Sequence, residues 1–128
     1  MNIKTIATSN APAAIGPYSQ AKVYNGVIYV SGQLPIYPAT GEIELGDIKT
    51  QTNLVMNNLV EIINAAGSNV DNILKATILL TDMAHFAQVN EVYASFFGES
   101  PPARICYQVS ALPRGASVEI DAVCAIAN

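Results

Sequence analysis

The sequence predicts an α+β fold with two layers, in which two helices cover one face of a mixed sheet of five or six strands. Three observations predict it: an Asn-Gly hairpin signal, two stretches with helical spacing of apolar residues, and an apolar strand-like run after each of them. Two helices side by side, each ~10 Å in diameter, cover only one face of such a sheet. The other face is therefore expected to pack against further copies of the chain.

The first strands flank Asn25 and Gly26, which both tolerate the positive φ that a two-residue hairpin turn requires. Residues 22–24 and 27–31 are rich in β-branched and aromatic side chains. The sequence therefore predicts an antiparallel hairpin.

The first helix is expected to begin after Asp47, a suitable N-cap, and to end at Gly67, which favours the left-handed backbone of a helix C-terminus. Apolar or small residues recur between them at helical spacing, which predicts an amphipathic helix. These residues are Ile48, Thr52, Val55, Leu59, Ile62 and Ala66.

A strand is predicted over residues 72–81, and Asp82 can cap a second helix. Residues 73–80 and 105–112 are apolar on both faces, as in strands that are covered twice, which again indicates a homo-oligomer packed through its sheets. The second helix is expected to end at Gly98, before two prolines that cannot continue it. Its apolar stripe consists of Phe86, Val89, Tyr93 and Phe97.

Two charged residues interrupt the apolar pattern of the last strands. Arg104 lies in a strand over 102–109 and Glu119 in one over 118–123, and the turn residues at 112–115 predict that these strands pair as a hairpin. A buried charge must be paired or used. The two side chains either neutralise each other as an ion pair, or hold a ligand carboxylate and move a proton.

Length and composition fit one domain spanning residues 1–128, because a chain of this size can bury a substantial core without disulfides or metal. Hydrophobic residues make up 51% of the chain and charged residues only 12%, against roughly 25% charged in ordinary domains. Some of this apolar surface is expected to meet another subunit.

Charge and cysteine usage exclude several classes of function. The net charge of −4, without a clustered basic stripe, argues against a nucleic-acid partner. Cys106, Cys124 and the lone His85 show no familiar metal-ligand spacing, so no metal is expected. Because we find neither a signal-peptide pattern nor a membrane span, we expect a cytoplasmic protein with reduced thiols.

Six short blocks resemble, in order and spacing, the RidA (YjgF-like) family of enamine and imine deaminases, and together they extend over nearly the whole chain. The blocks are NAPAAIGPYSQ at 10–20, VSGQLP at 30–35, TGE at 40–42, NEVY at 90–93 with Phe96 and Phe97, PAR at 102–104, and VEI at 118–120. Ile105 and Tyr107 depart from the smaller or aliphatic residues common in the family, and they are expected to alter packing or a subunit contact. By strand alternation both project away from Arg104.

The resemblance implies a homotrimer with ligand clefts between subunits. It implies hydrolysis of reactive 2-imino acids and their enamine tautomers, such as 2-iminobutanoate and 2-iminopropanoate, to 2-keto acids and ammonia without a cofactor. In this reading Arg104 holds the substrate carboxylate and Glu119 positions or activates the water. Such hydrolysis needs a held substrate, a directed water and a proton path, but no covalent nucleophile or metal.

The resemblance also places Tyr18, Ser31, Gly32 and Cys106 in the pocket wall, and Asn90 is a further candidate for substrate contact. Each has a structural alternative. Tyr18 can be a lid over the core, Ser31 and Gly32 can be turn residues, and Cys106 can be a small buried hydrophobe. Asn90 can bridge helix to loop.

Asp121 shares a strand face with Glu119 and either tunes that carboxylate or bonds between subunits. His85 opens the second helix and is interpreted as a surface residue, outside the site.

Two other functions fit the same sequence. A non-catalytic sensor of 2-keto acids or similar metabolites would use the same cleft. The second alternative is a chaperone-like protein, or a ribonuclease and translation inhibitor. The acidic composition argues against RNA binding.

Overall fold

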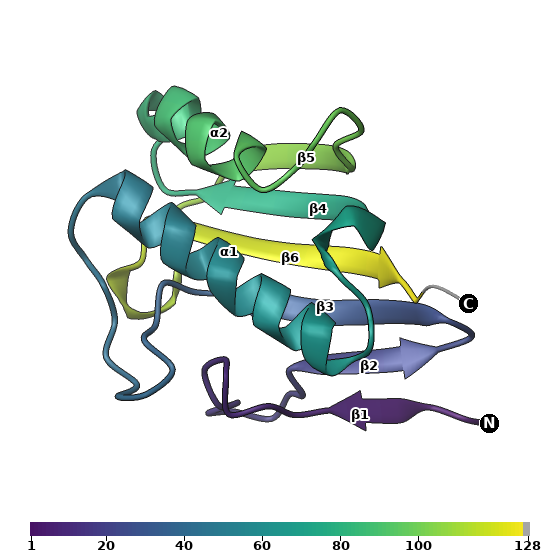
Figure 1. Cartoon of the computed structure of the whole chain (residues 1–128). Helices are drawn as coiled ribbons and strands as arrows, with labels where there is room; N and C mark the ends of the chain where they lie inside the picture. The colour runs from purple at the N-terminus through teal and green to yellow at the C-terminus, as the bar shows by residue number, and fades with distance from the viewer. Residues whose placement is uncertain (127–128) are drawn as a thin grey trace.

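The computed structural model describes residues 1–126 as six strands, two α-helices and three short 3₁₀ turns (Figure 1). The strands are β1 (Lys4–Ile6), β2 (Ala21–Tyr24), β3 (Val27–Gln33), β4 (Ile73–Leu80), β5 (Ala103–Gln108) and β6 (Val118–Ala125). The helices are α1 (Ile48–Ala65) and α2 (Phe86–Ala94), and the 3₁₀ turns are η1 (Val70–Asn72), η2 (Met83–His85) and η3 (Pro113–Gly115).

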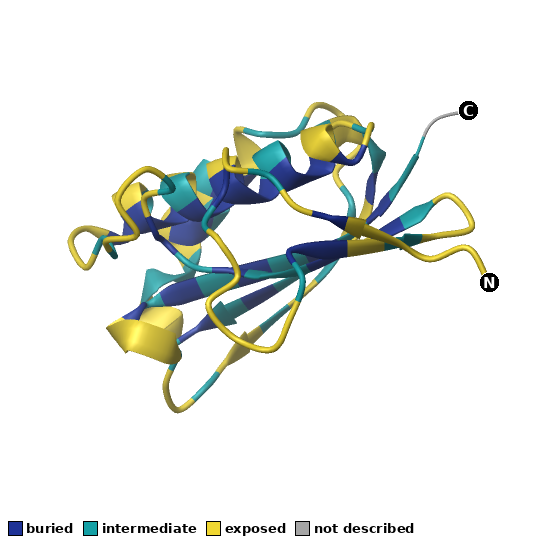
Figure 2. Ribbon diagram, turned by 90° about the horizontal axis from the view of Figure 1, so that it is seen from below, coloured by how far each residue is buried: buried dark blue, intermediate teal, exposed yellow. Residues whose placement is uncertain are grey.

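All strands form one mixed sheet in the order β1-β2-β3-β6-β4-β5, and both helices lie on the same face (Figure 1). Figure 2 shows that the buried positions concentrate between the helices and the sheet. This confirms the predicted two-layer α+β class. The β4–β5 pair is parallel and the other pairs are antiparallel.

The N-terminal hairpin is confirmed: β2 and β3 pair antiparallel around Asn25 and Gly26, which have φ values of 51° and 75°. The short edge strand β1 was not predicted. It has only three residues, and strand periodicity needs a longer run to stand out.

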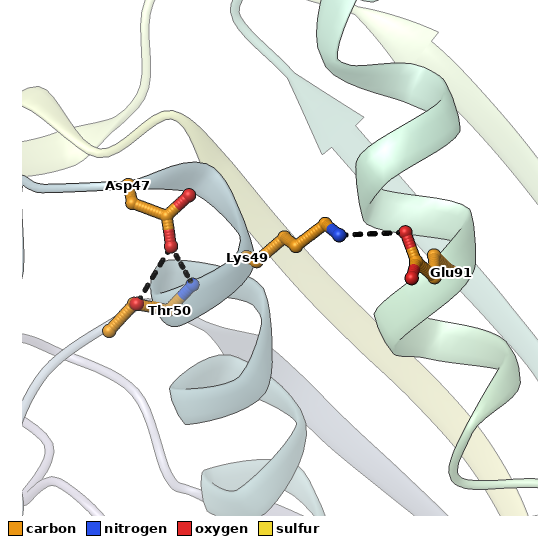
Figure 3. A network of polar contacts seen from close by, with 4 residues as sticks. All are labelled: Asp47, Lys49, Thr50 and Glu91. Atoms are coloured by element: carbon orange, nitrogen blue, oxygen red, sulfur yellow. Dashed lines mark hydrogen bonds and ion pairs between the residues drawn. The ribbon is translucent and has the colours of Figure 1, made fainter.

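The first helix forms where the sequence predicts it. The side chain of Asp47 accepts hydrogen bonds from the Thr50 backbone N–H and hydroxyl (Figure 3), and Gly67 follows the helix with φ +90°. Lys49 pairs with Glu91 of α2 at 2.8 Å, so a surface ion pair joins the two helices. The buried face of α1 packs on β3 and β6.

The second helix is shorter than predicted. Asp82 caps the 3₁₀ turn η2 by accepting from the Ala84 N–H, and α2 then ends at Ala94, before Phe97 and Gly98. Phe97 still packs against Tyr93, with ring centroids 4.8 Å apart, so the apolar stripe continues in irregular backbone.

The predicted hairpin of the last two strands is wrong, because β4 lies between β5 and β6. The connecting segment crosses the end of β4: the Val109 N–H donates to the Leu80 carbonyl, and the Thr81 N–H donates to the Ser117 carbonyl. Turn residues show where the chain reverses but not whether another strand fits into the reversal. Strand β6 is buried at every second residue, and pairing with both β3 and β4 places it in the middle of the sheet.

Within the described residues, neither helix is long and apolar enough to cross a membrane.

Candidate functional site

Arg104 lies on the helix-covered face of the sheet. Its register partner in β4 is Ala76, which is buried under the helices, and paired residues of neighbouring strands point to the same face. Arg104 Nη1 donates to Asn90 Oδ1 at 2.6 Å, and Arg104 Cζ lies 5.5 Å from the Phe86 ring centroid and 5.3 Å from that of Tyr93. The aromatic rings and one amide therefore fix the guanidinium while most of its donors stay uncommitted.

A cavity of ≈ 490 Å³ opens beside Arg104. Aromatic, proline and small residues form most of its wall, and Asn90 and Arg104 supply its polar groups. The other lining residues are Tyr93, Ala94, Phe97, Gly98, Pro101 and Pro102.

Glu119 lies on the opposite, open face. It pairs with Leu79, and its neighbours Val118 and Ile120 are the residues that point into the core. A second cavity, of ≈ 360 Å³, contains Glu119 and brings three other candidate residues together. It is lined by Ile15, Tyr18, Ser31, Gly32, Leu34, Pro113, Arg114 and Glu119.

Gly32 allows the Glu119 carboxylate to lie directly against β3. A Cβ at position 32 would be 2.2 Å from Glu119 Oε2. Burial raises the pKa of Glu119, and the neighbouring Asp121 carboxylate raises it further. A carboxylate with a raised pKa is a better proton acceptor at neutral pH, as a general base requires.

The opposite faces exclude the ion-pair alternative for Arg104 and Glu119. Among residues 1–126 the ion pair between side chains is Lys49–Glu91, and neither candidate takes part in it. Within one copy of the chain, the guanidinium and the Glu119 carboxylate open into different cavities.

The loop before β2 and the end of β3 hold the second cavity together. The Ser31 hydroxyl donates to the Ser19 carbonyl at 2.6 Å, and the Ser31 N–H donates to the Gln20 carbonyl at 2.9 Å. Tyr18 is half exposed and lines this cavity. The tyrosine loop and the Ser31–Gly32 end of β3 are thus joined at the cavity wall.

The remaining candidates lie outside both cavity walls. Cys106 is half buried on the same face as Arg104, and burial raises the pKa of its thiol, with Arg104 opposing. A raised pKa keeps the thiol protonated and so disfavours a nucleophile. Asp121 accepts from the Thr77 N–H at 3.1 Å, and the Nδ1 atom of His85 is buried without a partner among the described residues. His85 is therefore less exposed than the sequence suggested.

Sequence reasoning gave no site role to Ile15, Leu34, Pro113 and Arg114, which line the Glu119 cavity. All four lie in loops or turns, where periodicity carries no information. Arg114 has a positive φ of 59° in a turn whose sequence, Pro-Arg-Gly, predicts chain reversal but no site role. Among residues 1–126, no three His, Cys, Asp or Glu side chains lie close enough to hold a metal ion.

Comparison with known proteins identifies the family to which this fold corresponds. The family model Endoribonuclease L-PSP matches residues 8–126. A curated relative, the 2-iminobutanoate/2-iminopropanoate deaminase of Mus musculus, is 48% identical over 120 residues, which cover 94% of this chain and 89% of the relative.

Solved structures agree with this match. YyfA of the Rid protein family from Yersinia pestis superposes with a TM-score of 0.95 at 45% identity, covering 98% of this chain and 100% of that one. TdcF from E. coli, solved with bound serine, superposes with a TM-score of 0.92 at 42% identity, covering 97% and 99% of the two chains. These matches define an α+β protein of the Rid fold. The chain belongs to the RidA (YjgF-like) family.

Proposed function

We propose that this protein hydrolyses 2-imino acids and their enamine tautomers, such as 2-iminobutanoate and 2-iminopropanoate, to 2-keto acids and ammonia. We propose further that it does so as a homotrimer, in clefts between subunits, with Arg104 from one copy and Glu119 from the next. The single observation that carries this proposal is that Arg104 and Glu119 lie on opposite faces of the sheet, each at its own cavity.

The guanidinium suits the substrate carboxylate. Among the described residues Arg104 makes one side-chain hydrogen bond, to Asn90, and the fork of its other N–H donors matches a carboxylate in bidentate geometry. The relative solved with bound serine holds an amino acid, which also carries a carboxylate. The relative from Mus musculus carries the name of the proposed activity.

Glu119 is suited to activate the water that attacks the imine. The carboxylate accepts a proton from water as the water oxygen bonds to C2 of the protonated imine, which gives a carbinolamine. Glu119 then returns that proton to the nitrogen. The C–N bond breaks, ammonia leaves with the bonding electron pair, and the hydroxyl gives its proton to the Glu119 carboxylate as the C=O bond forms. Glu119 then passes this proton to the departing ammonia, which leaves as ammonium, and is ionised again. Atoms and charges balance without a further reactant.

The open sheet face suits a partner copy. Tyr29 is 52% exposed and Tyr107 is 57% exposed on this face, and Ile105 lies beside Tyr107. Large exposed apolar residues on one flat face are typical of a subunit interface. Strand β5 is also an edge strand, with one side free to pair.

Turnover tests the activity. The purified protein is incubated with 2-iminobutanoate generated in place by a threonine dehydratase, and keto-acid and ammonia release are followed. We expect release above the spontaneous rate, and loss of that excess in Arg104→Ala. Background release from the wild-type protein, with 2-oxobutanoate still bound, would leave a metabolite sensor as the function.

Subunit mixing tests the shared site. Arg104→Ala and Glu119→Gln chains, each inactive alone, are unfolded together in equal amounts and refolded. If each site takes Arg104 from one copy and Glu119 from its neighbour, random assembly restores about a quarter of the sites. Wild-type protein taken through the same cycle is the control. No recovered activity, with trimers formed, would place both residues in a site within one chain.

A further inference from the structure

We infer that Gln20 is a positioning residue, whose buried amide fixes the loop that carries Tyr18 against the Glu119 cavity. This rests on the proposed function, because Tyr18 and Glu119 share the cavity to which we assign the water. Gln20 itself lines neither the Arg104 cavity nor the Glu119 cavity.

Gln20 uses both ends of its amide on one loop. Its Oε1 accepts from the Thr8 N–H at 2.7 Å, and its Nε2 donates to the carbonyls of Thr8 at 3.0 Å, Pro12 at 2.8 Å and Ala11 at 3.4 Å. The side chain is only 4% exposed. A single amide therefore binds the beginning and the middle of the segment between β1 and β2. Figure 1 shows the course of this segment.

This segment lacks the regular backbone hydrogen bonds of a helix or a strand. Residues 7–20 contain neither helix nor strand, and most of them are exposed. Apart from the bonds of Gln20, the segment is closed on itself by the Asn10 N–H to the Thr8 hydroxyl and by the Tyr18 N–H to the Gly16 carbonyl. Ordering such a loop costs backbone entropy, which a few buried hydrogen bonds must offset.

The backbone of Gln20 completes the connection to the cavity. Its carbonyl accepts from the Ser31 N–H, and the next residue along β3, Gly32, lies against the Glu119 carboxylate. The residue thus joins the loop through its side chain and the cavity wall through its main chain. Removing the amide is expected to free Tyr18 without touching Glu119.

The test compares Gln20→Met, which keeps the length and apolar stem but none of the four bonds, with Ser68→Ala. Ser68 holds the Ala125 carbonyl at 2.6 Å, at the far end of β6 from Glu119, so its loss removes a loop-to-sheet bond away from the cavities. Gln20→Glu keeps an acceptor for Thr8 and loses the donors, and it serves as a graded variant if Gln20→Met does not fold.

Three results are expected. Amide hydrogen exchange of Thr8 and Tyr18 becomes faster in Gln20→Met, that of Tyr18 also becomes faster in Gln20→Glu, and both stay unchanged in Ser68→Ala. The kcat/KM for the imine falls by about tenfold or more in Gln20→Met, since misplacing a cavity wall by an ångström has effects of this size. In a Tyr18→Ala background the same change has less than about twofold effect, because non-additivity marks residues that act through one another.

The proposal is overturned if exchange at Thr8 and Tyr18 is unchanged, if kcat/KM stays at the wild-type value, or if the loss is fully additive with Tyr18→Ala. The exchange measurement needs no turnover. A wild-type protein without activity would therefore refute the proposed function while exchange, with binding of 2-oxobutanoate, still decides the role of Gln20.

Discussion

The Nη1 atom of Arg104 lies 2.6 Å from Oδ1 of Asn90, across the boundary between β5 and α2. The helix therefore sets the direction of a side chain that the strand supplies. This bond connects two polar residues in the wall of the Arg104 cavity.

Asn90 gives the first prediction. Asn90→Ala frees the guanidinium and is expected to raise KM for the imine by roughly tenfold or more, in line with the loss of one hydrogen bond to a charged group. Asn90→Asp keeps the acceptor but pairs Arg104 with a carboxylate, so it is expected to weaken substrate binding more than Asn90→Ala does. Steady-state kinetics and titration with 2-oxobutanoate check both. Equal effects would show that the charge of Arg104 is not what holds the ligand.

Gly32 gives the second prediction, which concerns the position of the Glu119 carboxylate. The Cβ of Gly32→Ala meets the far end of the Glu119 side chain, at 2.2 Å from Oε2, so the carboxylate must move while the backbone need not. We expect kcat/KM to fall by about a hundredfold with little change in Tm. Gly46→Ala is the control, because its Cβ meets only the half-buried Glu44 side chain, at 3.2 Å and away from Glu119. A fully active Gly32→Ala would remove Glu119 from the mechanism.

Asp121 gives a prediction about pH. Burial is the main cause of the raised pKa of Glu119, and the Asp121 charge adds to it. Asp121→Asn removes that charge but keeps an oxygen for the Thr77 N–H, so the pKa of Glu119 falls. The acid limb of the kcat/KM profile, which rises as Glu119 loses its proton, is expected to move to lower pH. A ¹³C titration of the Glu119 carboxyl checks the assignment independently of turnover, and an unmoved titration would contradict it.

Glu119 also gives a prediction about stability. Because its pKa is raised in the folded state above 4.5, the folded chain holds this proton more tightly than the unfolded chain. The stability gained from this tighter proton binding is fully present below pH 4.5 and is lost as pH rises through the pKa of Glu119 in the folded chain. Glu119→Gln is therefore expected to raise Tm relative to wild type at about pH 8 but not in acid. Calorimetry at both pH values checks this, with Glu42→Gln as a surface carboxylate control.

The open face gives a prediction about assembly. Tyr107→Glu places a charge where we propose that subunits meet, and it is expected to shift the protein toward monomers and to abolish turnover together. Ile3→Glu, at a comparable exposure of 51% but beside the opposite edge strand, is the control. Light scattering after gel filtration measures both. Trimers that persist in Tyr107→Glu would move the interface elsewhere.

Local signals made much of the fold predictable. Asn25-Gly26 predicted its hairpin because few residue pairs tolerate two positive φ values, and Asp47 predicted a helix start because its carboxylate satisfies a free backbone N–H. The family blocks also identified the family, and the structure and comparisons support it. What failed was non-local: the Pro-Arg-Gly turn predicted a reversal, yet β4 separates the two strands.

The sequence alone determined which residue types are present for chemistry, among them Arg104 and Glu119, and the alternation that sends each to one face of its strand. Only the tertiary structure decided that these are opposite faces, because that depends on which strand each pairs with and in which register. Strand order is set by burial summed over the whole sheet, which favours β6 in the centre and β5 at the edge. No short stretch of sequence contains the information needed to predict this strand order.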